Sequence, residues 1–143
     1  MIKDLENFKT YNKSMEFAEK VWTIVRAWNF FDKDTIGKQL VRSSDSIGAN
    51  LSEGLGRYHF KETKNFAYYA RGSVFESKTW LTKSFNRKLI TKEQFEPLIQ
   101  ELDVIGKMVN GYISSIGIVE EPMEIYSLHQ NTLSNTQPTT PVA

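Results

Sequence analysis

One stretch of the sequence decides the fold: Arg42-Ser43-Ser44-Asp45-Ser46-Ile47-Gly48-Ala49-Asn50-Leu51-Ser52-Glu53-Gly54. Apolar residues recur at nearly helical intervals within and around it, which predicts a helix. They are Ile36, Leu40, Ile47, Leu51 and Leu55. The residues between them are mostly small and would let a neighbouring backbone approach closely. We therefore expect a central helix on which the rest of the chain packs.

The composition narrows the class of protein. The chain has 143 residues, of which 40% are hydrophobic, and this favours one domain with a substantial core. It contains no cysteine, which excludes a disulfide scaffold, a cysteine-ligated zinc site and a thiol nucleophile. No apolar run approaches the roughly 20 residues of a membrane span. The charged segment 1–17 lacks the apolar core of a signal peptide, so we expect a cytoplasmic protein.

Four amphipathic segments with short connections predict an all-α, antiparallel up-down-up-down four-helix bundle. The expected helices span about residues 9–29, 34–54, 60–85 and 91–117. Residues 1–117 would form the bundle as one domain. The polar, aperiodic residues 118–143 would form a flexible, disordered tail.

The first expected helix carries two adjacent apolar stripes, which predict burial on more than one side. One stripe is Tyr11, Met15, Ala18, Trp22 and Val25, and the other is Phe17, Val21, Ile24 and Trp28. The bundle core accounts for most of this surface, and its width leaves room for a subunit interface. The fourth helix has the clearest heptad period: Phe95, Leu98, Leu102, Ile105, Val109, Tyr112 and Ile116.

Helix ends are indicated by capping residues and glycines. Asp32 or Asp34 could cap the second helix, and Gly54 with Gly56 would end it. Thr91 precedes Gln94 by three residues, as a capping box requires. Pro97 leaves two alternatives. Either the first turn of the fourth helix is irregular, or the helix begins at Glu96 with Pro97 at its first position.

The charges are unevenly distributed along the chain. All 18 Lys and Arg residues fall within residues 1–117, against 14 acidic residues, while residues 118–143 contain Glu120, Glu121 and Glu124 and no basic residue. The third expected helix carries a basic-aromatic face on a different side from its core face. Lys61, Lys64, Arg71 and Lys78 could contact phosphates, and Tyr68 could stack on bases. The alternative is a solvated face, with Phe75 buried at a subunit contact.

The sequence offers little catalytic chemistry. His59 and His129 have no partner at metal-ligand spacing, and there is no P-loop or Glu-x-x-His pair, so we expect no catalytic residue, metal or cofactor. Glu53 and Glu76 could act as a carboxylate pair. We favour a structural interpretation, in which a polar network sets helix register or joins subunits. Its members would be Arg42, Ser46, Asn50, Glu53 and Glu76.

Two blocks resemble a family of small bacterial four-helix bundles, the 23S rRNA intervening-sequence proteins. Ser46-Ile47-Gly48-Ala49-Asn50-Leu51-Ser52-Glu53-Gly54 is similar to the family motif Ser-Ile-x-Ala-Asn-Ile-Ala-Glu-Gly, and Val41-Arg42-Ser43-Ser44 precedes it. The second block, Phe-x-x-x-Ala-x-Gly-Ser-x-x-Glu, is matched by Phe66, Ala70, Gly72, Ser73 and Glu76. The likeness covers about residues 5–117. It departs from the family at Gly48, where Pro is common, and at Leu51-Ser52, which replaces Ile-Ala.

The resemblance implies self-association and a nucleic-acid role. Members are similar to the accessory protein of diversity-generating retroelements, which forms a barrel-like homopentamer and binds nucleic acid and a reverse transcriptase. By this likeness, the partners would be further copies of the chain, RNA or DNA, a reverse transcriptase or a ribosomal nucleoprotein. We expect a non-enzymatic homo-oligomer, specifically a pentamer, that binds nucleic acid through its basic surface. The alternative is a protein-interaction scaffold with no nucleic-acid role.

Overall fold

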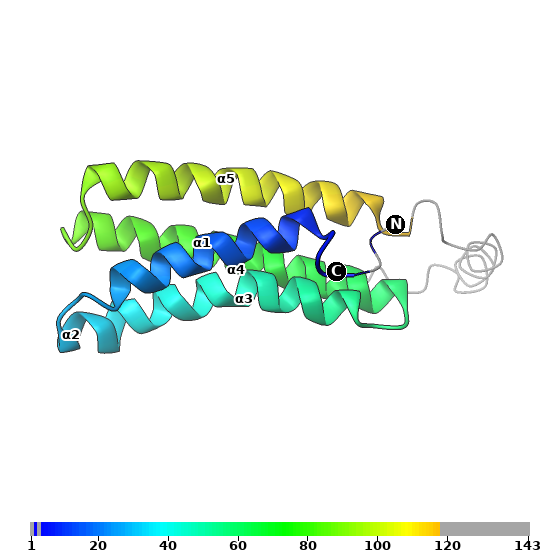
Figure 1. Ribbon diagram of the computed structural model, residues 1–143, viewed down its shortest axis with the longest axis horizontal. Helices are drawn as coiled ribbons and strands as arrows, with labels where there is room; N and C mark the ends of the chain where they lie inside the picture. The colour runs from blue at the N-terminus through cyan, green and yellow to red at the C-terminus, as the bar shows by residue number, and fades with distance from the viewer. Residues whose placement is uncertain (1, 3, 118–143) are drawn as a thin grey trace, which may run out of the picture.

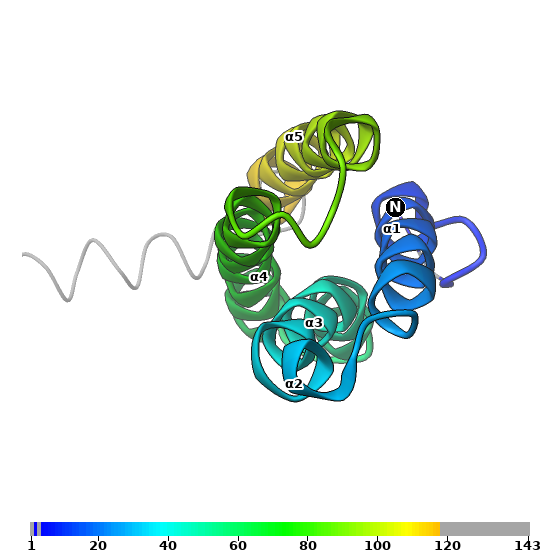
Figure 2. The same ribbon diagram turned by 90° about the vertical axis from the view of Figure 1, so that its left-hand side faces the viewer.

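Four long helices pack side by side in a computed structural model, which describes residues 2 and 4–117 (Figure 1). Within these residues the elements are α1 (Lys9–Val25), α2 (Phe30–Asp32), the π-helix η1 (Lys33–Gly37), α3 (Lys38–Leu55), α4 (Phe60–Asn86) and α5 (Lys92–Ser115). Consecutive long helices run antiparallel, and the end-on view shows the order α1, α3, α4, α5 (Figure 2). The all-α antiparallel bundle is thus confirmed. The predicted tail, residues 118–143, lies outside the described residues.

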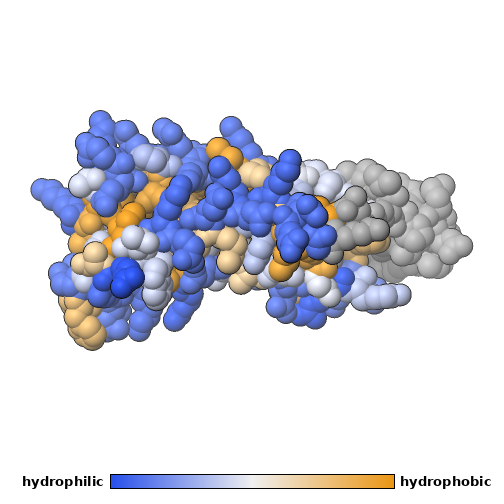
Figure 3. Space-filling model, in the orientation of Figure 1, coloured by the Kyte–Doolittle hydropathy of each residue, from blue (hydrophilic) through white to orange (hydrophobic). Residues whose placement is uncertain are grey.

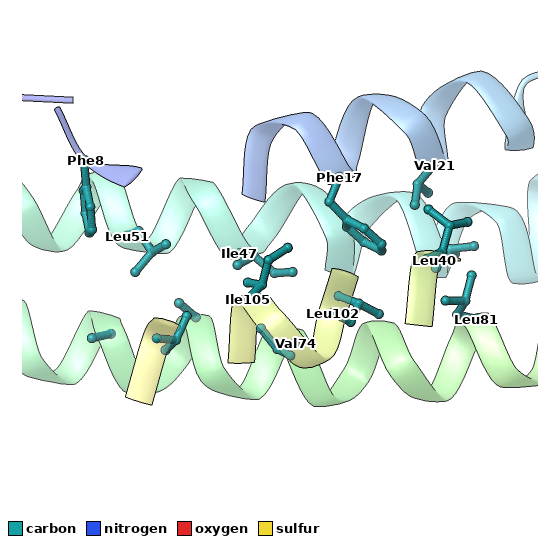
Figure 4. Close-up of a cluster of buried hydrophobic side chains, with 14 of the residues drawn as sticks. Phe8, Phe17, Val21, Leu40, Ile47, Leu51, Val74, Leu81, Leu102 and Ile105 are labelled. Atoms are coloured by element: carbon teal, nitrogen blue, oxygen red, sulfur yellow. The ribbon is translucent and has the colours of Figure 1, made fainter. Parts of the chain in front are cut away.

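The core lies on the bundle axis and draws on all four long helices (Figure 4). Phe17 from α1, Ile47 from α3 and Ile105 from α5 are fully buried there, and Val74 from α4 is nearly so. The heptad of α5 is confirmed, because Leu98, Leu102, Ile105, Val109 and Ile116 are buried and Phe95 and Tyr112 are partly buried. Burial of this continuous apolar surface is the main force that assembles the helices.

The two apolar stripes of α1 have different environments. Phe17 and Val21 point into the core, whereas Met15 and Trp22 remain exposed on the outer side. Each stripe is therefore buried only in part, since Ala18 and Val25 are also buried, and Ile24 and Trp28 are half-buried. Met15 also lies against α3, because a Cβ at Gly48 would lie 3.0 Å from the Met15 sulfur.

The connection between α1 and α3 differs from the sequence prediction. Helix α1 ends at Val25 instead of residue 29, and the cap of the following element is Asn29, whose Oδ1 accepts from the Asp32 amide at 2.9 Å. The predicted caps Asp32 and Asp34 are wrong, since these residues lie inside α2 and η1. The chain passes through η1 into α3 without a break, which is how π-helical turns commonly occur.

Gly54 allows α3 and α4 to approach each other closely, in addition to lying near the end of α3. A Cβ there would lie 2.7 Å from the Cβ of Phe66 and 3.0 Å from the carbonyl oxygen of Thr63, so α3 and α4 meet at backbone contact. The Thr63 hydroxyl donates to the Gly54 carbonyl at 2.8 Å. Helix α3 ends at Leu55 with Gly56 as its C-cap, so the helix end predicted at these glycines is confirmed, although Gly56 has φ −77° and is not left-handed.

The start of α5, Pro97 within it and Gly72 within α4 were each open to question from the sequence. The capping box of Thr91 and Gln94 is confirmed, and α5 begins at Lys92, so the alternative start at Glu96 is wrong. Pro97 lies inside the helix, where it removes one backbone hydrogen bond. Gly72 lies inside α4 without a close neighbour, because no atom of another element lies within 4 Å of a Cβ built there.

Candidate nucleic-acid interface

The predicted basic-aromatic face forms a continuous line along α4, which we call the α4 stripe. Its members are Lys61, Lys64, Tyr68, Arg71, Phe75 and Lys78. Their spacing of three and four residues places them on one side of a helix. This side borders α5, because two members contact it. The sequence pattern therefore identified a surface that the bundle leaves at least partly open.

Arg71 lies at the centre of the α4 stripe and contacts two other side chains. Its guanidinium carbon lies 4.9 Å from the ring centroid of Tyr68, which is a cation-π distance. Its Nη1 donates to the Asn110 side-chain oxygen on α5 at 3.4 Å, a long and weak hydrogen bond. The ring of Tyr68 thus has one cation beside it and is 42% exposed. Because Asn110 is neutral, this contact holds Arg71 in place without compensating its positive charge.

Lys78 at the far end of the stripe is more strongly engaged. Its Nζ lies 2.6 Å from a carboxylate oxygen of Asp103 on α5 and 5.6 Å from the ring centroid of Phe75. A phosphate could reach Lys78 only in competition with Asp103. Phe75 is exposed, so its ring is available to a partner.

Lys61 and Lys64 occupy the first turns of α4. Lys61 is exposed and Lys64 is half-buried, and neither forms an ion pair with any residue in the described part of the chain. Together with Arg71, these two cations are therefore less compensated than Lys78. The adjoining turn adds Tyr58, which is 92% exposed, and Phe60. Sequence reasoning did not assign these two aromatic residues to the surface, although they lie just before and beside Lys61 in the sequence.

The predicted polar network is not assembled within one chain. The Ser46 hydroxyl donates to the Arg42 carbonyl at 2.7 Å, and the Asn50 amide donates to the Ser46 carbonyl at 2.9 Å, so these groups serve the backbone of α3 itself. Glu53 pairs with Arg57 at 2.8 Å. Glu76 is exposed and forms no ion pair among the described residues. Arg42, Glu53 and Glu76 are exposed and so project outward from α3 and α4, while Ser46 and Asn50 are half-buried. A role between subunits stays a prediction.

The buried polar contact between α3 and α4 is made by two serines instead. The Ser77 hydroxyl donates to the Ser43 hydroxyl at 2.9 Å, and Ser43 in turn donates to the Leu40 carbonyl at 3.2 Å. Both serines are buried. The only signal in the sequence was the high content of small residues, which indicates close packing but does not name the bonded pair.

Other titratable groups lie away from the α4 stripe. Burial, and secondarily the Glu19 carboxylate, raises the pKa of Asp45 above its ordinary value. Burial likewise raises the pKa of Tyr112. His59 is exposed at the start of α4, and His129 lies outside the described residues. Among the residues described, no three His, Asp or Glu side chains form a group that could hold a metal ion. None of the helices described is long and apolar enough to cross a membrane.

Comparison with known proteins places the chain in a family. Residues 6–111 match the family model described as 23S rRNA-intervening sequence protein. The chain belongs to this family. A solved structure from Bacteroides thetaiotaomicron, a protein with unknown function from the S23 ribosomal protein family, is similar with a TM-score of 0.67 and 26% identity. The match covers 74% of this chain and 99% of that one. A search of curated proteins found no match.

The structure explains why the two blocks that resemble the family occur together. Gly54 ends the first block and Phe66 begins the second, and these residues meet where α3 and α4 touch. The Ser43–Ser77 hydrogen bond ties the same two helices further along. One residue of each block thus takes part in the contact between α3 and α4, and the two serines lie just outside the blocks.

Proposed function

We propose that this member of the family is a non-enzymatic homo-oligomer that binds nucleic acid through the α4 stripe. The proposal rests on the alternation of cations and exposed aromatic rings along one face of α4. Lys61, Lys64, Arg71 and Lys78 would contact phosphates, and Tyr68 would stack on a base. Ammonium and guanidinium groups bind the sugar-phosphate backbone without regard to sequence, while aromatic rings accept any base. The surface thus favours a structured or single-stranded nucleic acid over a specific duplex site.

The four cations would contribute unequally. Lys61, Lys64 and Arg71 form no ion pair with any of the described residues, so they would engage phosphate before Lys78. Lys78 would have to exchange Asp103 for a phosphate oxygen. A single subunit would therefore bind weakly, and useful affinity would need several copies of the stripe acting together.

Exposed apolar side chains support self-association. Trp22 is 51% exposed, and Phe30 and Phe31 of α2 are 80% and 72% exposed. Figure 3 shows apolar surface at the end of the molecule where α2 lies. Large apolar side chains gathered on a surface commonly mark protein contacts. We propose a pentamer, the assembly that the family resemblance implies, in which each copy adds one α4 stripe.

The test is binding of a fluorescently labelled structured RNA to the full chain over a range of salt concentrations. We expect Lys61→Gln with Lys64→Gln to weaken binding at least tenfold at low salt. The slope of log affinity against log salt should fall by about 0.7–0.9 for each phosphate that the variant no longer neutralises. The matched control, Lys33→Gln with Lys83→Gln, removes two exposed charges elsewhere and should weaken binding less. Light scattering on the same samples reports the number of subunits.

Two results would contradict the proposal. One is the absence of RNA binding by the full chain at low salt. The other is an equal reduction of affinity in the stripe variant and the control, which would show only a general dependence on net charge.

The second candidate function is a protein-interaction scaffold without a nucleic-acid role. It is favoured by the engagement of Lys78 with Asp103, and by the exposed rings of Trp22, Phe30 and Phe31. Apolar contacts depend little on ionic strength, whereas phosphate contacts weaken steeply. A partner retained in high salt would therefore identify the scaffold.

A further inference from the structure

A groove with a volume of about 310 Å³ lies between α1 and the segment formed by η1 and α3. It is found at the end of the bundle where α2 lies (Figure 1). Val25 and Gly37 are buried beneath it, and the more exposed side chains of Trp22 and Val41 line it as well. Sites for small molecules commonly have volumes of about 300–1,000 Å³, so this groove can hold one ring system or a short alkyl chain.

The π-helix η1 shapes this groove, because its first and last residues, Lys33 and Gly37, both line it. A Cβ at Gly37 would lie 2.8 Å from Cγ1 of Val25 and 3.0 Å from the carbonyl oxygen of Asp32. A larger residue would therefore push α1 and η1 apart beneath the groove. Single π-helical turns are rare and occur frequently at functional sites.

Three cations border the apolar part of the groove, namely Arg26, Lys33 and Lys38, and all three are exposed. Lys38 pairs with Asp34 at 3.3 Å. Arg26 and Lys33 form no ion pair with any residue in the described part of the chain. The described residues that line the groove include no carboxylate. The positive charge at this end of the groove is therefore available to an anion.

Carboxylates lie beyond the other end of the groove. Glu19 precedes Trp22 by three residues on α1, and the cations follow Trp22. Asp45 comes four residues after Val41 on α3, about one helical turn further along. Burial, and secondarily the Glu19 carboxylate, raises the pKa of Asp45, so the two carboxylates lie near each other. An anionic group is thus repelled from this end and attracted to the end with the cations.

We propose that the groove binds a small organic anion, whose apolar ring or short alkyl chain packs on Trp22 and whose carboxylate meets Arg26 and Lys33. Apart from the indole N–H of Trp22, the lining side chains offer no neutral hydrogen-bonding group, so the body of the ligand is held by apolar contact. An aromatic body would also stack on Trp22, which is 51% exposed. The groove is formed by α1, η1 and α3, so this site does not depend on the α4 stripe or on the proposed function.

Isothermal titration calorimetry of the full chain with 2-naphthoate tests the site. 2-Naphthamide has the same two rings and no charge, and 2-naphthylmethylammonium has the opposite charge. We expect naphthoate to bind most tightly and the ammonium least tightly. In high salt the preference for naphthoate over the amide should shrink, because salt screens exposed charges. Equal affinities for the three compounds, or no binding of naphthoate at low salt, would overturn the proposal.

Substitutions locate the site. Arg26→Gln with Lys33→Gln should weaken the binding of naphthoate about three- to tenfold, as expected for the loss of two exposed ion pairs, and leave that of naphthamide unchanged. The matched control, Arg87→Gln with Lys107→Gln, removes the same charges from exposed positions outside the groove and should bind naphthoate as the native chain does. Trp22→Ala should weaken both compounds alike, because it removes apolar contact. Equal losses in the charge variant and its control would overturn the proposal.

The same titrations distinguish other occupants of the groove. Naphthoate affinity that rises as the protein is diluted, while light scattering shows dissociation, would mean that a second copy of the chain fills the groove, and would overturn the proposal. Displacement of naphthoate by a structured RNA would make the groove part of a nucleic-acid surface, and would also overturn it. Binding of naphthoate that RNA does not affect supports the proposal. If naphthoate binds and RNA does not, only the nucleic-acid function fails.

Discussion

Gly54→Ala tests whether α3 and α4 are held at backbone contact. The added Cβ would lie 2.7 Å from the Phe66 Cβ and 3.0 Å from the Thr63 carbonyl oxygen. Carbon atoms pack best at about 3.5–4.0 Å, so the two helices would have to separate by about 1 Å at this point. Neither contact is with the end of a long side chain that could rotate away. The strain must therefore be relieved by movement of the backbone.

The expected magnitude combines three effects. Overpacking of a well-packed contact costs about 1–3 kcal/mol. Separation of the helices would also weaken the Thr63–Gly54 hydrogen bond, which contributes about 1 kcal/mol. Alanine recovers at most about 1 kcal/mol of helix propensity, and less here because Gly54 lies in the last turn of α3. We therefore expect the free energy of unfolding to fall by about 1–3 kcal/mol.

Gly72→Ala provides a matched control. Gly72 is exposed in the interior of α4, and nothing lies within 4 Å of a Cβ built there. The same substitution should raise the free energy of unfolding by up to about 1 kcal/mol. Urea denaturation followed by circular dichroism, at one fixed protein concentration, would measure both variants. A Gly54→Ala protein as stable as the native chain would refute the argument that this contact requires glycine.

Three further predictions concern other parts of the bundle. Ser43→Ala should lower the free energy of unfolding by about 1–3 kcal/mol because it leaves the buried Ser77 hydroxyl without its acceptor. In a double-mutant cycle with Ser77→Ala, the two losses of stability should be less than additive. Strict additivity would show that the hydrogen bond contributes nothing. Thr91→Ala removes the cap of α5 and should lower the free energy of unfolding, measured by urea denaturation, by about 1 kcal/mol. Thr91→Ser keeps a capping hydroxyl and should retain most of that stability. Equal destabilisation by both substitutions would argue against the cap. Asp45→Asn should stabilise the fold slightly at pH 7, by less than about 1 kcal/mol since Asp45 is largely exposed, because the folded state raises the pKa of Asp45 and so disfavours its charged form. The gain should vanish as the pH falls through this raised pKa, where the native carboxyl becomes protonated, and a gain that persists at low pH would point to a cause other than charge.

Local patterns predicted much of this protein. The heptad of α5 and its capping box follow from contacts between residues three or four positions apart, so they can be recognised in the sequence and they occur in the structure. The α4 stripe is predictable for the same reason, since any helix presents residues at this spacing on one side. The two blocks resembling the family also located α3 and α4 correctly.

Contacts between distant residues were decided only by the tertiary structure. Gly54 looked like a helix terminator, yet its role is set by Phe66, which approaches from another helix. The pairing of Lys78 with Asp103 likewise depends on the register of α4 against α5. Glu53 and Glu76 were expected to share a network, but the rotation of each helix about its axis turned them outward. Helix register and rotation are determined by the packing of the whole core, and no local spacing records them.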